Sequence, residues 1–156
     1  MKRGSVVILQ MIVILIGIGA LAFMLWEPLV EGRNAHATFV DIYFRDPFLA
    51  FAYVGSIPFF VALYQALKAL RYAGSKNKFA PGSANALRTI RYCAFVIIGF
   101  VVVGELFIMI SDSDDRAGGA FMGILITLGS IAVAFAAAAF ERRLQNTVEM
   151  RPTSGK

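Results

Sequence analysis

Side chains that could do chemistry are few in this chain and lie far apart. His36 is the only histidine and Cys93 the only cysteine, which excludes an intrachain disulfide and a metal site built from several cysteines. Glu105 is the one acidic or basic residue well inside a long apolar stretch. An acidic side chain there costs about 2.5 to 3.5 kcal/mol on insertion scales if it faces lipid, so we expect Glu105 to face other helices.

The depth of Glu105 within its stretch indicates which residues could surround it. At about 1.5 Å per residue it lies about 9 Å from the nearer end, and Tyr53 and Gly123 lie at similar depths in two other stretches. We therefore hypothesise a hydrogen bond between Glu105 and Tyr53 where helices approach closely at Gly123. Glu105 would then be either a site that responds to protons or cations, or a structural residue that reaches toward water or Arg116.

Small residues mark one face of the last apolar stretch. Gly119 and Gly123 are four residues apart, and Ser130, Ala134 and Ala138 continue the spacing. Small residues at this spacing let helix backbones approach closely in a membrane. The pattern predicts a tight helix contact, either with another part of the same chain or with a second copy in a homo-oligomer.

The second apolar stretch carries the features of a kinked helix. Pro58 lacks a backbone N–H, and Gly55 and Ser56 lie beside it, so we predict a kink in mid-membrane. Such a kink is often purely structural, and a gating role is the alternative. Further along, residues 74–82 should interrupt the helix, with Ser83 as the N-cap of the next one.

Four long apolar runs must position these residues. They cover residues 6–26, 47–67, 92–110 and 117–140, and about 20 residues suffice for a helix to cross a bilayer. With 58% hydrophobic and 16% charged residues, a soluble protein of this length is not expected, because it could not cover four apolar helices with polar surface. The predicted fold is an all-α integral membrane protein, a bundle of four transmembrane helices in one domain.

The charges predict the orientation of the four spans. Of the 15 Lys and Arg residues, 12 lie before residue 6, in the loop 68–91 or in the tail 141–156. The loops 27–46 and 111–116 hold the other three and seven acidic residues. Cytoplasmic segments retain Lys and Arg, so both termini should be cytoplasmic and these two loops exported. The alternative that a peptidase cleaves at Ala20-Leu21-Ala22 would leave three spans with the same orientation.

Three segments carry a resemblance to a known family. The segment PFLAFAYVGSIPFFVALYQ from Pro47 and the segment KNKFAPGSANALRTIRYCA from Lys76 are similar to the domain-of-unknown-function 2975 family of bacterial membrane proteins. The fourth span and its exit, GILITLGSIAVAFAAAAFERRLQ, are similar as well. The resemblance implies a small four-span protein of the bacterial inner membrane. Many such proteins are encoded beside a short helix-turn-helix regulator, which implies a regulatory partner. The chain ends EMRPTSGK, where members often carry a Glu-Asn-Asp-like tail.

Three classes of function can be compared on these residues. An enzyme is not expected, because the histidine, the cysteine and the buried acid lie at different predicted depths, and no cofactor or metal is expected either. Direct nucleic-acid binding is not expected, because the basic residues are dispersed and the net charge of +5 reflects topology and attraction to the lipid bilayer. We favour a regulatory or sensor component with a small cytoplasmic partner. The alternative is a transporter or channel component for a small solute, protons or cations that uses Glu105.

Overall fold

The computed structural model describes residues 3–30, 47–74, 81–110 and 116–149, and all of these are helical. The helices are α1 (Arg3–Val30), α3 (Pro47–Gly74), α4 (Pro81–Ile110) and α5 (Arg116–Glu149). Within the described residues there is no strand, so the all-α fold class is confirmed. Residues 31–46, 111–115 and 150–156 lie outside this description, and with them most of the predicted exported loops, His36 and the end of the tail.

Proline marks the first residue of two of these helices. Pro47 opens α3 and Pro81 opens α4, because a proline at the first helical position loses no hydrogen bond and its φ already suits a helix. Ser83 therefore lies within the first turn of α4 and is buried, at 5% exposure. The expectation that Ser83 is the N-cap was wrong, because the proline sets the start two residues earlier.

The helices extend beyond the apolar runs at one end of the molecule. α4 has 30 residues, which corresponds to about 45 Å, whereas a hydrocarbon core is about 30 Å thick. The predicted cytoplasmic loop is helical over residues 68–74 and 81–91, and α5 continues through residues 141–149 of the predicted tail. Polar residues near these helix ends are therefore held on rigid helices.

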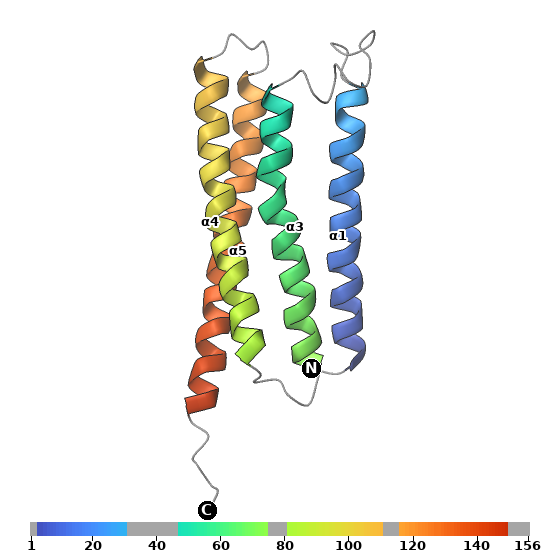
Figure 1. Ribbon diagram of the computed structural model, residues 1–156, viewed down its shortest axis with the longest axis vertical. Helices are drawn as coiled ribbons and strands as arrows, with labels where there is room; N and C mark the ends of the chain where they lie inside the picture. Colours follow the sequence, from blue (N-terminus) through green and yellow to red (C-terminus); the bar gives the residue numbers. More distant parts are fainter. Residues whose placement is uncertain (1–2, 31–46, 75–80, 111–115, 150–156) are drawn as a thin grey trace, which may run out of the picture.

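The helices pack in chain order, and α4 has a neighbour on each of two sides. α4 contacts α3 and α5 extensively, whereas α1 contacts chiefly α3 (Figure 1). Successive helices are antiparallel, so the beginning of α1 and the end of α5 lie at the same end of the molecule. We call this the basic end, because the described cations of three helices gather there: Lys68, Arg71, Arg88, Arg91, Arg142 and Arg143.

Aromatic side chains packed on glycines join α3 to α4. A Cβ on Gly55 would lie 3.1 Å from the ring of Phe100, and one on Gly104 would lie 3.4 Å from the ring of Phe51. The two rings also contact each other, with centroids 5.2 Å apart. Each helix thus places a phenylalanine against a glycine of the other, which brings the backbones close together.

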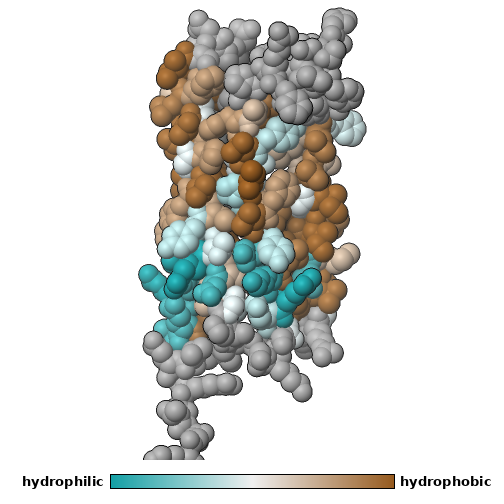
Figure 2. Space-filling model, viewed as in Figure 1, coloured by the Kyte–Doolittle hydropathy of each residue, from teal (hydrophilic) through white to brown (hydrophobic). Residues whose placement is uncertain are grey.

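The outer surface of the helices is apolar over most of its length. Large side chains such as Ile110, Phe135 and Trp26 are 84%, 73% and 69% exposed. Figure 2 shows apolar side chains above a band of hydrophilic ones that lies toward the basic end. All four helices are long and apolar enough to cross a membrane. In water such a surface would drive association, and in a bilayer it is the surface that lipid covers.

Candidate functional site

Glu105 lies at a close approach between α4 and α5. The site where a Cβ of Gly123 would lie is occupied by the carboxyl oxygen Oε1 of Glu105, so any larger residue at position 123 would displace the carboxyl group. One helical turn away, a Cβ on Gly119 would lie 2.9 Å from Cδ1 of Ile108, also in α4. The partner of this small-residue face is therefore another helix of the same chain.

Tyr53 faces a different helix from the one expected. Its hydroxyl group donates its hydrogen to the carbonyl oxygen of Met24 in α1, at 2.9 Å, and not to Glu105. The hydrogen bond between Tyr53 and Glu105 was expected because the two residues lie at similar predicted depths in the membrane. Depth gives no information on the direction in which a side chain leaves its helix, and Tyr53 points toward α1.

The residues around Pro58 have separate structural roles. α3 is one helix from Pro47 to Gly74, and Pro58 lies inside it without ending it. Ser56 donates its side-chain hydrogen to the carbonyl oxygen of Tyr53, at 2.7 Å, a local bond that serines often make in helices. Gly55 provides the surface on which Phe100 packs. These contacts explain a glycine and a serine beside the proline, and the predicted kink itself stays a prediction.

The packed face of α5 continues to the end of the apolar run. Buried and half-buried residues recur at alternating intervals of four and three, as in the seam of a coiled coil: Gly123, Thr127, Ser130, Ala134, Ala137 and Glu141. Ser130 and Ala134 are buried as expected of packing residues, at 9% and 6% exposure. The spacing of 3.5 residues, and not four, brings Ala137 into the seam in place of Ala138. The next position of the seam is Glu141.

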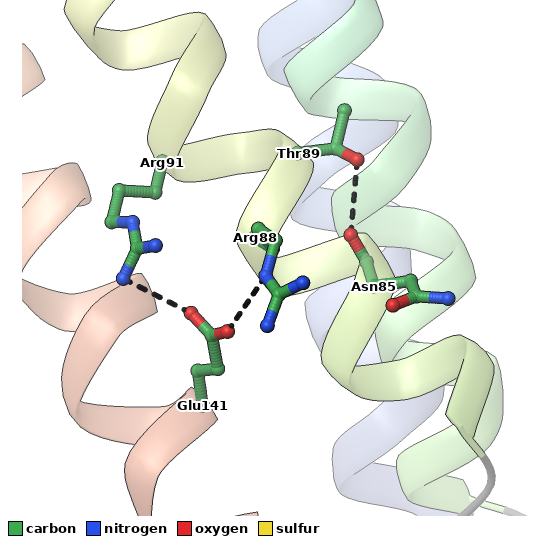
Figure 3. Close-up of polar contacts among 5 residues, drawn as sticks. All are labelled: Asn85, Arg88, Thr89, Arg91 and Glu141. Carbon is green, nitrogen blue, oxygen red and sulfur yellow. Dashed lines mark hydrogen bonds and ion pairs between the residues drawn. The ribbon is translucent and has the colours of Figure 1, made fainter.

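Glu141 forms a cluster with two arginines of α4 at the basic end (Figure 3). Its Oε1 accepts a hydrogen bond from Nε of Arg88 at 3.1 Å, and its Oε2 lies 3.1 Å from Nη1 of Arg91. The second contact is an ion pair without the alignment of a hydrogen bond. The side chain of Glu141 is only 5% exposed, whereas those of Arg88 and Arg91 are 50% and 31% exposed.

Burial and charge make this cluster different from an ordinary surface ion pair. A buried carboxylate is costly unless cations and hydrogen bonds compensate it, and both guanidinium groups supply that compensation here. Arg88 and Arg91 are three residues apart, so they lie on neighbouring positions of one helix face. Sequence reasoning missed the cluster because Glu141 was assigned to the tail, although the seam spacing reaches it.

The described residues contain no arrangement typical of a metal centre. No group of three or more His, Cys, Asp or Glu side chains lies close enough to hold a metal ion within these parts of the chain. Cys93 is a buried free thiol of α4, at 8% exposure, beside Ala94 at 2%. Its environment is that of a small apolar side chain in a helix contact.

Comparison with known proteins gives the family. The profile of the family described as "Protein of unknown function (DUF2975)" matches residues 32–152, which include α3, α4 and α5. The chain belongs to the DUF2975 family. The uncharacterized membrane protein YoaS of Bacillus subtilis (strain 168) is 32% identical over 153 residues, or 97% of this chain and 96% of that protein. No solved structure is significantly similar to the chain.

Membership of the DUF2975 family confirms the resemblance read from the sequence. Together with the four apolar helices, it makes this DUF2975 chain a multi-pass membrane protein. The family is one of unknown function, so it assigns no role to Glu105, Tyr53 or the arginine cluster. Which side of the membrane the basic end faces stays a prediction from the distribution of Lys and Arg.

Proposed function

We propose that this protein is a non-catalytic regulatory or sensor component of the membrane that acts through a small cytoplasmic partner at its basic end. The observation that carries the proposal is the Arg88–Glu141–Arg91 cluster, which fixes the end of α5 against α4. The partner class suggested by the family resemblance is a short helix-turn-helix regulator, so the protein would affect nucleic acid only through that partner.

The extension of α5 supports a role in partner binding. Residues 141–149 continue the helix past its apolar run by about 13 Å. Arg142, Gln145 and Asn146 are exposed on this extension, whereas Glu141 is buried and anchors it. A rigid polar helix end requires little ordering when a partner binds, which favours affinity. A change in the exported loop would reach this surface through the α1, α3 and α4 contacts.

The test is co-purification of the detergent-solubilised protein with a short helix-turn-helix regulator, the partner that the family resemblance implies is encoded beside its gene. We expect capture by the unaltered protein and by the Leu125→Ala control, whose side chain is 49% exposed on the lipid-facing side of α5. Capture should fall with Arg142→Glu, which reverses a charge on the exposed extension. Failure of the unaltered protein to capture the regulator in both detergent and nanodiscs would refute the proposal.

A second candidate function rests on Glu105. Its carboxyl group packs against Gly123 between two helices, where a proton or a small cation could bind. The corresponding function is a transporter or channel component for protons, cations or a small solute. The test is flux into liposomes that contain the purified protein, with Glu105→Gln as the isosteric variant. Flux that is absent from the unaltered protein, or equal in Glu105→Gln, would exclude this candidate.

A further inference from the structure

The arginine cluster lies at the height where a lipid bilayer places its phosphate groups. Arg91 directly precedes the apolar run 92–110, and Glu141 directly follows the run 117–140. On the neighbouring helix, Lys68 directly follows the run 47–67. α3, α4 and α5 alternate in direction, so these three residues lie at the same height, at the boundary of the hydrocarbon core.

The cluster keeps an excess of positive charge that points outward. One buried carboxylate faces two guanidinium groups, and the hydrogen bond from Arg88 is donated by Nε. In Figure 3 one terminal nitrogen of Arg88 points away from Glu141, and the other lies beside the carboxylate. Half of the Arg88 side chain is exposed, so the guanidinium group is accessible to a ligand on the outer side of α4.

The surface next to Arg88 is the kind that an acyl chain covers. Tyr92, Phe95 and Val96 follow Arg88 on the same face of α4 and are 59%, 57% and 45% exposed. Gly99 continues this face, and open space lies where its Cβ would be. Arg88 thus lies at the membrane boundary, at one end of an apolar strip of α4 that extends into the membrane. Arg91 also lies over the ring of Tyr92, with 5.7 Å between Cζ and the ring centroid.

We propose that Arg88 and Arg91 bind the phosphate group of an anionic phospholipid whose acyl chains lie along this strip of α4. The planar guanidinium group matches two oxygens of a phosphate, which a lysine ammonium group does not. Glu141 fixes both guanidinium groups from the buried side, so little side-chain entropy is lost on binding. The phosphate lies on the opposite, exposed side, away from the carboxylate of Glu141.

The experiment compares retention of phosphatidylglycerol and phosphatidylcholine by the delipidated protein in a mild detergent, measured by native mass spectrometry. We expect the unaltered protein to prefer phosphatidylglycerol. The double variant Arg88→Lys/Arg91→Lys keeps the positive charges and removes the planar guanidinium groups. We expect it to retain phosphatidylglycerol about tenfold more weakly. Arg142→Lys is the matched control on an exposed arginine at the same end, with an expected change of less than about twofold.

Three results would overturn the proposal. Equal retention of both lipids by the unaltered protein would mean that no anion-selective site exists, whatever the folding of the variants. Unchanged retention in a double lysine variant that keeps its helical circular dichroism would mean diffuse surface attraction. Displacement of phosphatidylglycerol by millimolar inorganic phosphate would mean that the site takes a free anion and that the apolar strip contributes nothing.

Discussion

Removing the charges of the arginine cluster in different combinations should have unequal effects on stability. The Arg88→Gln/Arg91→Gln variant leaves Glu141 with a side chain that is 5% exposed and without its two cations. Leaving a buried charge uncompensated costs about 3 to 5 kcal/mol. The Glu141→Gln variant leaves two arginines that already reach solvent, at 50% and 31% exposure, so its cost should be about 1 kcal/mol.

The difference of about 2 to 4 kcal/mol corresponds to a factor of roughly 30 or more in the unfolding equilibrium. It is measurable by titration with sodium dodecyl sulfate in mixed micelles, followed by far-ultraviolet circular dichroism. The triple variant, with all three residues replaced by Gln, should recover most of the loss, because no charge is then buried. Arg142→Gln, next to Glu141 but exposed, is the control and should change stability by less than about 0.5 kcal/mol.

The reasoning is refuted if Glu141→Gln is as damaging as the double arginine variant. It is also refuted if the triple variant is no more stable than the double variant. Either result would mean that the cluster stabilises the protein by mutual attraction alone, and that the burial of the carboxylate carries no cost.

Two contacts between helices lead to further predictions. Gly123→Ala should destabilise the protein by about 1 to 3 kcal/mol because its methyl group displaces the carboxyl group of Glu105, whereas Gly129→Ala, with open space at its Cβ, should be neutral or stabilising. Adding Glu105→Ala should remove most of the Gly123→Ala penalty, and persistence of the full penalty would contradict the contact. Tyr53→Phe should cost about 0.6 kcal/mol in the same titration, because it removes the hydroxyl group that donates to Met24, and a cost near zero would argue against that bond.

Each of the four described helices contains one of the apolar runs predicted from the sequence, because length and hydropathy identify the part of a helix that crosses a membrane, whereas the polar extensions of these helices were not predicted. The close contact at Gly119 and Gly123 in α5 also agrees with the prediction from their four-residue spacing, which favours close helix approach. What the sequence left open was the direction of side chains around each helix axis. Tyr53 lies at the expected depth but points to α1, and that direction is set by how α3 packs between α1 and α4.

The arginine cluster illustrates a second limit of the sequence. Glu141 follows the apolar run and precedes two arginines, so composition assigns it to a solvated tail. Only the alternation of four and three residues along α5, continued past the last apolar position, places it in the packed seam. Its partners lie 50 and 53 positions earlier, and hydropathy carries no information about a pairing of that kind.

The attachment of α1 to the rest of the molecule bears on how freely this helix can diverge. Because α1 packs chiefly on α3, a substitution on most of its circumference meets only lipid, and even its contact side disturbs a single interface. α4 has two such interfaces, with α3 and with α5, so fewer of its positions are free of helix contacts. Mutational drift should therefore be tolerated most readily in α1, which makes it the part of the protein best placed to acquire new associations without loss of the fold.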